Sequence, residues 1–264
     1  MRQRIVTGML AALFFLAILF AGNKLYVLLI AALAVIAYYE FAKLNGARAF
    51  DPSSVIGFAG TLYLVTPWQH IAGFLVPPQQ TVIWLLMFLF FVSTVISKNR
   101  TSIDKIALLF IGVVYIGIGF HYMVYTRFIE QGLYWTILLF GCIWLTDAGA
   151  YFSGRFFGKH LLWPSISPKK TIEGAVGGIV ISVVTAVIFA LAAPELLTLG
   201  KSIVIGVFVS VIGQLGDLIQ SAYKRVRNIK DSGNILPGHG GILDRTDSWI
   251  VVFPLVHFLG LLPH

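Results

Sequence analysis

The stretch from Ser221 to Asp247 reads Ser-Ala-Tyr-Lys-Arg-Val-Arg-Asn-Ile-Lys-Asp-Ser-Gly-Asn-Ile-Leu-Pro-Gly-His-Gly-Gly-Ile-Leu-Asp-Arg-Thr-Asp. It gathers charged residues and glycines between two long apolar runs, in a chain of 264 residues that is 58% hydrophobic and only 11% charged. Further apolar runs long enough to cross a bilayer recur on the N-terminal side of this stretch. The pattern predicts an all-α protein, a polytopic bundle of transmembrane helices.

We expect about nine membrane spans, with the polar residues gathered between them. They cover roughly residues 4–21, 25–43, 53–68, 80–97, 104–125, 132–153, 171–193, 200–223 and 241–261. The third span is short, and the sequence leaves open whether residues 69–80 after it form a re-entrant piece. We divide the chain into residues 1–130, with spans one to five, and residues 131–264, with spans six to nine and the predicted active site.

The basic residues predict the orientation of these spans. With the N-terminus in the cytoplasm, 16 of the 19 Lys and Arg residues fall on the cytoplasmic side, as the positive-inside rule requires. This places the protein in the cytoplasmic (inner) membrane with residues 224–245 facing the cytoplasm. The net charge of +8 does not indicate nucleic-acid binding, because the charges lie between the apolar runs.

Four aspartates are expected near one depth in the membrane. Asp147 and Asp217 each lie seven or eight residues before a basic residue that marks the cytoplasmic end of a span, a rise of about 10–12 Å. Asp244 and Asp247 enter the last span from the same side, and their spacing of three places them on one helix face. An Asp in the middle of a span costs up to ~3 kcal/mol, so the group predicts a bound divalent cation.

The basic cluster of Lys224, Arg225, Arg227 and Lys230 suits a ligand with several phosphates. Taken alone, such a cluster more often sets topology or touches anionic lipid. The neighbouring glycines allow the backbone to turn and to approach a ligand closely. His239 lies among these glycines and has room to reach a phosphate.

A second candidate stretch runs from Ser167 to Gly174. Ser167 and Pro168 predict the start of a helix, which would place Lys169 and Lys170 at a helix N-terminus that favours anions. Ordinary capping with topology charges explains this stretch equally well. Gly174 and Gly178, four residues apart, predict close helix packing. The single cysteine, Cys142, lies in an apolar run and is predicted to be a small buried residue.

These motifs together resemble the phosphatidate cytidylyltransferase family, also called CDP-diacylglycerol synthases. The family signature is matched in spacing throughout, at Ser221, Lys224-Arg225, Lys230-Asp231, Gly233, Pro237 to Gly241 and Asp244 to Asp247. Asp147 and the stretch from Ser167 to Thr171 extend the resemblance over about residues 140–250. The departures, Tyr223 and Ile172, replace neither a charged residue nor a glycine of the signature.

The resemblance implies transfer of the cytidylyl group of CTP to phosphatidic acid, with Mg²⁺ as cofactor, a second cation left open, and a homodimer in contact with membrane lipid. The expected catalytic residues are Asp217, Asp244, Asp247, Lys224 and His239. The expected substrate-binding residues are Ser221, Lys224, Arg225, Lys230, Asp231, Gly240, Gly241, Arg245, Lys169 and Lys170. The expected metal ligands are Asp147, Asp217, Asp244 and Asp247.

Two other functions are weighed against this one. A CTP-dependent kinase of a polyprenol or another long-chain alcohol would release CDP instead of pyrophosphate. A cation transporter would need polar groups across the whole membrane, whereas these carboxylates are predicted at the cytoplasmic end only. Within the transferase reading we expect direct transfer between the substrates, since Cys142 is remote and Ser221 has no obvious base beside it; His239 is the one residue left open as a covalent acceptor.

Overall fold

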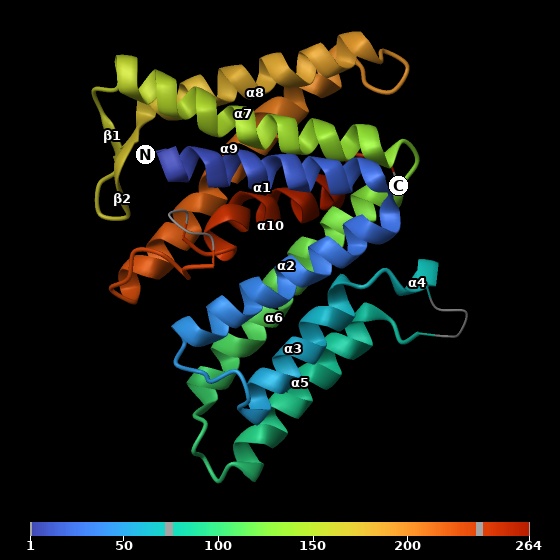
Figure 1. The fold of residues 1–264 in the computed structure, drawn as a ribbon, viewed down its shortest axis with the longest axis vertical. Coiled ribbons are helices and arrows are strands. Elements are labelled where there is room, and N and C mark those ends of the chain that lie inside the picture. Colours follow the sequence, from blue (N-terminus) through green and yellow to red (C-terminus); the bar gives the residue numbers. More distant parts are fainter. Residues whose placement is uncertain (1, 72–75, 236–239, 264) are drawn as a thin grey trace. The chain divides into compact units, whose positions relative to one another are not determined.

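The computed structural model describes residues 2–71, 76–235 and 240–263, with the side chains of residues 2–7 and 71 left out. It is built mainly of helices (Figure 1). In chain order these are α1 (Arg2–Ala21), α2 (Asn23–Leu44), α3 (Pro52–Val65), α4 (Trp68–Ile71), α5 (Gln79–Ile96), α6 (Ile103–Phe128), α7 (Gly132–Phe157), α8 (Ile172–Ala192), α9 (Leu199–Val226) and α10 (Leu243–Phe258).

Six helices in the described part of the chain are long and apolar enough to cross a membrane, namely α2, α5, α6, α7, α8 and α9. The protein is therefore an integral membrane protein of helical architecture, as predicted. Each of the nine predicted ranges contains a helix, but α3, α10 and the described apolar part of α1 are shorter than a typical span. The number of nine spans and the cytoplasmic N-terminus stay predictions.

The chain packs as two compact units. The first unit comprises residues 1–125 and 231–245, and the second comprises residues 126–230 and 246–264. The segment 231–245 therefore packs with the N-terminal helices, although it follows α9 in the sequence. The functional division at residue 130 predicted above concerns where the active site lies, and it stays a prediction.

In the first unit, helices pack closely where a residue that faces the neighbouring helix is a glycine. α3 lies against α2 and α5, and a side chain at Gly60 of α3 would meet Leu86 of α5 at 2.8 Å. The hydroxyl of Tyr26 in α2 donates to the carbonyl of Met123 in α6, at 3.5 Å. Tyr26 is fully buried, so this contact ties the N-terminal helices to α6 inside the unit.

In the second unit, α8 packs along both α7 and α9. A Cβ atom at Gly174 would lie 2.8 Å from the carbonyl of Ala150, and one at Gly178 would lie 3.1 Å from the carbonyl of Thr146. The prediction that these two glycines allow close helix packing is confirmed. Cys142 of α7 is completely buried, as expected for a small core residue.

A short antiparallel pair of strands joins α7 to α8, formed by β1 (Leu161–Trp163) and β2 (Ser167–Thr171). The prediction of a helix start at Ser167 is therefore wrong. The helix begins at Ile172, after Thr171, whose hydroxyl accepts a hydrogen bond from the backbone N–H of Gly174 at 3.1 Å. Thr is among the preferred N-cap residues, although it ranks below Ser, and pairing with β1 keeps residues 167–171 extended.

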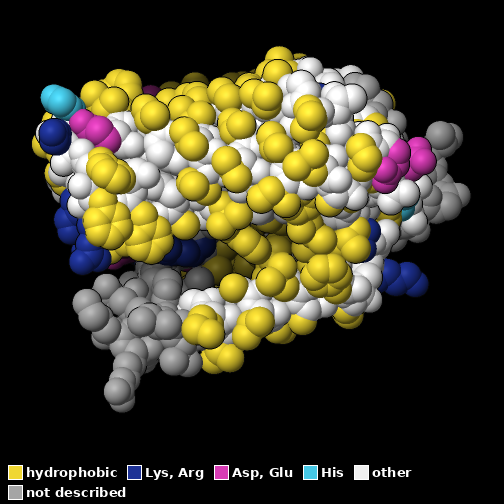
Figure 2. Space-filling view, turned by 90° about the horizontal axis from the view of Figure 1, so that it is seen from above, with side chains coloured by type: hydrophobic (Ala, Val, Ile, Leu, Met, Phe, Trp, Pro, Cys, Tyr) yellow, Lys and Arg dark blue, Asp and Glu magenta, His cyan; other side chains and the backbone are white. Residues whose placement is uncertain are grey.

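The outer surface of α7 and α8 is apolar. Figure 2 shows hydrophobic side chains spread over this face, with charged side chains gathered at its ends. Large side chains on α8 are about half exposed or more, among them Val176, Val180, Val184, Ile188 and Leu191. An apolar surface of this extent fits contact with lipid tails.

Candidate functional site

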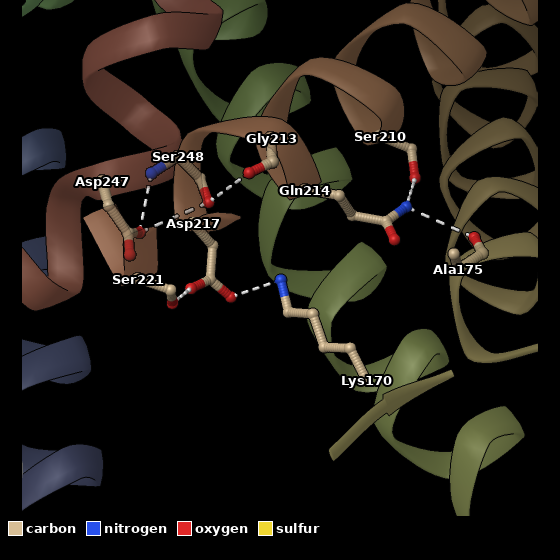
Figure 3. A network of polar contacts seen from close by, with 9 residues as sticks. All are labelled: Lys170, Ala175, Ser210, Gly213, Gln214, Asp217, Ser221, Asp247 and Ser248. Atoms are coloured by element: carbon tan, nitrogen blue, oxygen red, sulfur yellow. Dashed lines mark hydrogen bonds and ion pairs between the residues drawn. The ribbon is translucent and has the colours of Figure 1, made fainter. Parts of the chain in front are cut away.

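The centre of the candidate site in the second unit is Asp217, on α9. Its Oδ2 forms an ion pair with the ammonium group of Lys170 at 2.6 Å, and its Oδ1 accepts a hydrogen bond from the hydroxyl of Ser221 at 3.2 Å (Figure 3). Ser221 lies one helical turn after Asp217, so the local helix geometry brings the two side chains together. Both partners of the ion pair are about one-third exposed, so water and ligands can reach it.

Strand β2 is the element that brings Lys170 to this carboxylate. Lys170 precedes the capping residue Thr171, and β2 is in contact with both α8 and α9. The guanidinium Nε of Arg225, near the end of α9, donates to the carbonyl of Ile166 between the two strands, at 3.2 Å. The hairpin thus holds two predicted substrate-binding residues, Lys170 and Arg225, at the end of α9.

Asp247, in the first turns of α10, is the second carboxylate of this site. It is 8% exposed, and its Oδ1 accepts from the backbone N–H of Ser248 at 2.7 Å. The Ser248 hydroxyl in turn donates to the carbonyl of Gly213 on α9, at 2.9 Å (Figure 3). A Cβ atom at Gly216 would lie 2.7 Å from the carbonyl of Asp247, so the glycine before Asp217 allows α10 to approach α9.

The charges around Asp247 oppose one another. Asp217 and Asp147 of α7 place further negative charge near the Asp247 carboxylate, and Lys224 places positive charge near it. Three of the four predicted metal ligands therefore belong to the second unit, and two of them lie near enough to Asp247 to affect its charge. In the described residues, however, no three His, Cys, Asp or Glu side chains are grouped closely enough to hold a metal ion.

These residues fit a magnesium ion that is shared with a substrate. Mg²⁺ is commonly held by one or two carboxylates together with substrate phosphates, without a cage made of protein groups alone. Asp217 and Asp247 supply two carboxylates, while Lys170 occupies one oxygen of Asp217. Two carboxylates are the kind of donor that Mg²⁺ needs, and the magnesium cofactor stays a prediction.

The other predicted carboxylate, Asp244, lies in the first unit and organises the backbone around it. Its Oδ2 accepts from the backbone N–H of Ser232 at 2.7 Å, from the Ser232 hydroxyl at 2.9 Å and from the N–H of Gly241 at 3.0 Å. Gly240 has a φ of +83°, a conformation that glycine adopts without strain. Asp231 and Arg245 are exposed in the same unit, and His239 lies outside the described residues.

Sequence reasoning assigned no role to Glu40, which the structure places among the signature residues of the first unit. This side chain of α2 is 1% exposed and accepts hydrogen bonds from Ser232, Ile242 and Leu243. A single acid in an otherwise apolar span was the available signal, because a buried carboxyl needs partners. The contacts join positions about 200 residues apart, so no local pattern pointed to them.

One expectation about Ser221 is wrong. Its hydroxyl was expected to have no obvious base beside it, whereas the carboxylate of Asp217 accepts its hydrogen bond. The two residues are four apart on one helix, which was visible in the spacing. The Asp217 carboxylate also pairs with Lys170, so it contacts two side chains at once.

The structure thus distributes the predicted residues over two units. The second unit contains Asp147, Lys169, Lys170, Asp217, Ser221, Lys224, Arg225, Lys230 and Asp247. The first unit contains Asp231, Gly240, Gly241, Asp244 and Arg245. Direct contacts link Lys170, Asp217 and Ser221 in one unit, and Gly241 and Asp244 in the other. Lys169, Lys230 and Arg245 are exposed, as suits side chains that would meet a soluble anion.

Long apolar helices with carboxylates and cations gathered on them define an integral membrane protein with a polar, charge-lined site. The chain belongs to the cytidylyltransferase family, whose model matches residues 2–262. The predicted family resemblance is thereby confirmed, and with it the prediction of an enzyme of this type.

Relatives match the chain over nearly its whole length. A protein of Bacillus subtilis (strain 168) named phosphatidate cytidylyltransferase is 40% identical over 273 residues, covering 98% of this chain and 97% of the relative. Proteins of the same name from Staphylococcus saprophyticus and Staphylococcus haemolyticus are 39% and 38% identical over 259 residues, each covering 98% of both chains.

Proposed function

We propose that this protein transfers the cytidylyl group of CTP to phosphatidic acid, giving CDP-diacylglycerol and pyrophosphate. The observation that carries the proposal is the similarity of about 40% to proteins named phosphatidate cytidylyltransferase across almost the full length of both chains. A match of this extent includes both the apolar helices and the charged segments between them. The kinase and transporter alternatives have no comparable support.

In this proposal the carboxylates of the second unit hold Mg²⁺ and the cations bind phosphate. Asp217 and Asp247 are the ligands with most support, because both belong to the second unit and their side chains lie near one another (Figure 3). Asp147 of the same unit is a further predicted ligand. Asp244, which belongs to the first unit, and a second cation stay predictions from the sequence. When bound, Mg²⁺ would screen the charge of the triphosphate and favour the departure of pyrophosphate.

Lys170 has a distinct part in this scheme. The ion pair of 2.6 Å keeps Asp217 neutralised while the site lacks substrate. A triphosphate offers the ammonium group a stronger anionic partner, so Lys170 would move from the carboxylate to a phosphate on binding. Further positive charge for the triphosphate would come from Lys169, Lys224, Arg225, Lys230 and Arg245. The hydroxyl of Ser221 would keep its hydrogen bond to Asp217.

The reaction proceeds by direct transfer. A phosphate oxygen of phosphatidic acid attacks the α-phosphorus of CTP, and the bond from that phosphorus to the bridging oxygen of pyrophosphate breaks. The attacking oxygen is already anionic, so the protein has mainly to bring two anions together and to stabilise the leaving group. Cys142 is completely buried, and the hydroxyl of Ser221 faces a neutralised carboxylate, so neither is a good nucleophile.

The test uses purified protein in detergent with CTP labelled in the cytidine and, separately, at the γ-phosphate. The cytidine label should enter the lipid phase only when phosphatidic acid is present, and the γ-label should leave as pyrophosphate. Entry of the γ-label into an added long-chain alcohol would identify a kinase. Exchange of labelled pyrophosphate into CTP without phosphatidic acid, at a rate near turnover, would contradict direct transfer and indicate a covalent cytidylyl-enzyme.

The remaining predictions about the setting belong to the same proposal. The site faces the cytoplasm at the inner membrane, where CTP is available and the head of phosphatidic acid lies within reach. The exposed apolar side chains of the helices support contact with lipid. The homodimer stays a proposal that rests on the family resemblance alone.

A further inference from the structure

The carboxyl group of Glu40 is fully used by the signature segment of the first unit. Its Oε1 accepts from the backbone N–H of Ile242 at 3.0 Å, and its Oε2 accepts from the N–H of Leu243 at 2.9 Å. The hydroxyl oxygen of Ser232 lies 3.0 Å from Oε2, and its one hydrogen is shared between Glu40 and Asp244. Ile242 and Leu243 stand at the start of α10, where backbone N–H groups lack partners within the helix. A residue of α2 therefore supplies the acceptors that α10 needs.

Two signature glycines form the space that Glu40 occupies. The three atoms nearest to a Cβ placed at Gly233 all belong to Glu40, and the closest overlaps with it. A Cβ at Gly241 would overlap with both carboxyl oxygens of Glu40 and with the hydroxyl of Ser232. Neither glycine has a positive φ, so conformational freedom does not explain why glycine stands at these two positions. The close approach of the Glu40 carboxyl explains it, because a side chain at either position would overlap with that group.

Ser232 connects Glu40 to the predicted catalytic residue Asp244. Its hydroxyl lies 3.0 Å from Oε2 of Glu40 and 2.9 Å from Oδ2 of Asp244, and its backbone N–H also donates to Asp244. Ser232 is 4% exposed, so this connection is shielded from water. The orientation of Asp244 thus depends on a segment that Glu40 holds from the other side.

We propose that Glu40 is a positioning residue, which holds residues 232–233 and 241–243 in place, and that Gly233 and Gly241 are glycines because its carboxyl must fit between them. This inference rests on the proposed cytidylyl transfer, since it assigns Glu40 an effect on that reaction. Glu40 acts through Ser232, Asp244 and the start of α10, and it has no part in the chemical step itself.

The chemistry of the contact distinguishes a carboxyl from an amide of the same shape. Both oxygens of Glu40 accept from backbone N–H groups, so a Gln at this position would direct its NH₂ group at one of those donors. A buried donor without an acceptor is expensive, and one of the two N–H groups would be left in that state. A Gln side chain, although it has the same shape, therefore cannot replace the carboxyl of Glu40.

The first test compares Glu40→Gln with wild type, measuring kcat, KM for CTP and the fraction of monodisperse protein in detergent. We expect kcat/KM to fall about tenfold or more, because one buried hydrogen bond is lost. The fall should exceed any loss of folded protein, and Glu40→Asp should recover part of it. Equal activity of Glu40→Gln and wild type would overturn the inference, as would a fall that merely follows the folded fraction.

The second test is a double-mutant cycle between Glu40→Ala and Gly233→Ala. Because Glu40 is the obstacle to a Cβ at Gly233, Gly233→Ala should lower kcat/KM in wild type but have little further effect in Glu40→Ala. Gly178→Ala is the matched control, since the atoms nearest to a Cβ at Gly178 belong to Thr146 and Ala150. It should lower kcat/KM by the same factor in wild type and in Glu40→Ala. If Gly233→Ala lowered kcat/KM by the same factor in Glu40→Ala as in wild type, the inference would be contradicted. Wild-type protein that transfers no cytidine label would instead overturn the proposed function.

Discussion

At the scale of single residues, Asp217 and Asp247 differ in how their charge is compensated. Asp217 has Lys170 at 2.6 Å and Ser221 at 3.2 Å, whereas Asp247 relies on the backbone N–H of Ser248 and on a more weakly acting Lys224. Asp247 is nearly buried, and the charge of Asp217 repels it. A pair of like charges on neighbouring helices is costly unless a cation binds, which is consistent with a role in holding Mg²⁺.

The replacements Asp217→Asn and Asp247→Asn test this role. We expect each to lower kcat by at least about 100-fold, since each removes a charge that would hold the metal beside the reacting phosphates. Folding in detergent should be retained, because Asn keeps the size and shape of Asp, and the ion pair that Asp217→Asn loses is partly exposed and contributes little to stability. The measurements are turnover at limiting Mg²⁺ and the elution profile of the purified protein.

Asp104→Asn is the matched control, because Asp104 is an exposed carboxylate in the first turn of α6. Its activity should equal that of wild type. Near-normal turnover of Asp217→Asn or Asp247→Asn at limiting Mg²⁺ would remove that residue from the set of metal ligands.

At the scale of helices and strands, the site depends on two close approaches. Gly216 brings α10 against α9, and the hydroxyl of Ser248 bonds to the carbonyl of Gly213 at the same level. The aromatic rings of Phe140 on α7 and Trp249 on α10 pack edge to face with centroids 4.8 Å apart. On the other side, β2 carries Lys170 to Asp217. Asp217 and Asp247 lie near one another because α9 and α10 touch here (Figure 3).

Gly216→Ala should separate α9 from α10. The new Cβ would lie 2.7 Å from the carbonyl of Asp247 and 3.1 Å from Cα of Ser248, and backbone atoms cannot move aside as a side chain can. We expect activity to fall about tenfold or more and stability to fall by about 1–3 kcal/mol, as for other overpacked sites. Turnover and thermal unfolding in detergent are the measurements.

Gly200→Ala, in the same helix, is the control for Gly216→Ala. A Cβ at Gly200 meets nothing within 4 Å, so the change should leave activity intact and stabilise α9 by at most about 1 kcal/mol. Equal behaviour of the two variants would show that the contact at Gly216 does not position Asp247.

At the scale of the whole molecule, the distribution of charges and apolar runs is that of an integral membrane protein. The six long apolar helices leave many large side chains exposed, and the predicted orientation places 16 of 19 basic residues in the cytoplasm. The signature segment would then meet CTP from the cytoplasm and the head of phosphatidic acid from the inner leaflet. Topology is therefore the property on which the proposed function depends at this scale.

Cysteine labelling tests the orientation. Asn234→Cys lies in the predicted cytoplasmic segment and Glu130→Cys in a predicted outside loop, and both positions are exposed. An impermeant thiol reagent should label Glu130→Cys in intact cells, and Asn234→Cys only after the membrane is opened. The native Cys142 should stay unlabelled in both variants, because it is completely buried. The reverse pattern of labelling would overturn the predicted topology.

The sequence by itself determined the class of protein and the residues that form its charged segments. Hydropathy predicted where helices occur, because a segment in lipid must satisfy its backbone hydrogen bonds internally. The signature from Ser221 to Asp247 indicated the family through the spacing of residues within one short segment. These are properties of the local chain, and the helical architecture and the family match confirm them.

Only the tertiary structure decided which of these residues meet. Residues 167–171 form a strand because they pair with β1, although Ser167 and Pro168 by themselves are typical of a helix start. Glu40 reaches Ile242 and Leu243, and Lys170 reaches Asp217, through contacts between distant segments. The physical reason is that a buried polar group must find a partner wherever packing supplies one, and packing is a property of the folded chain as a whole.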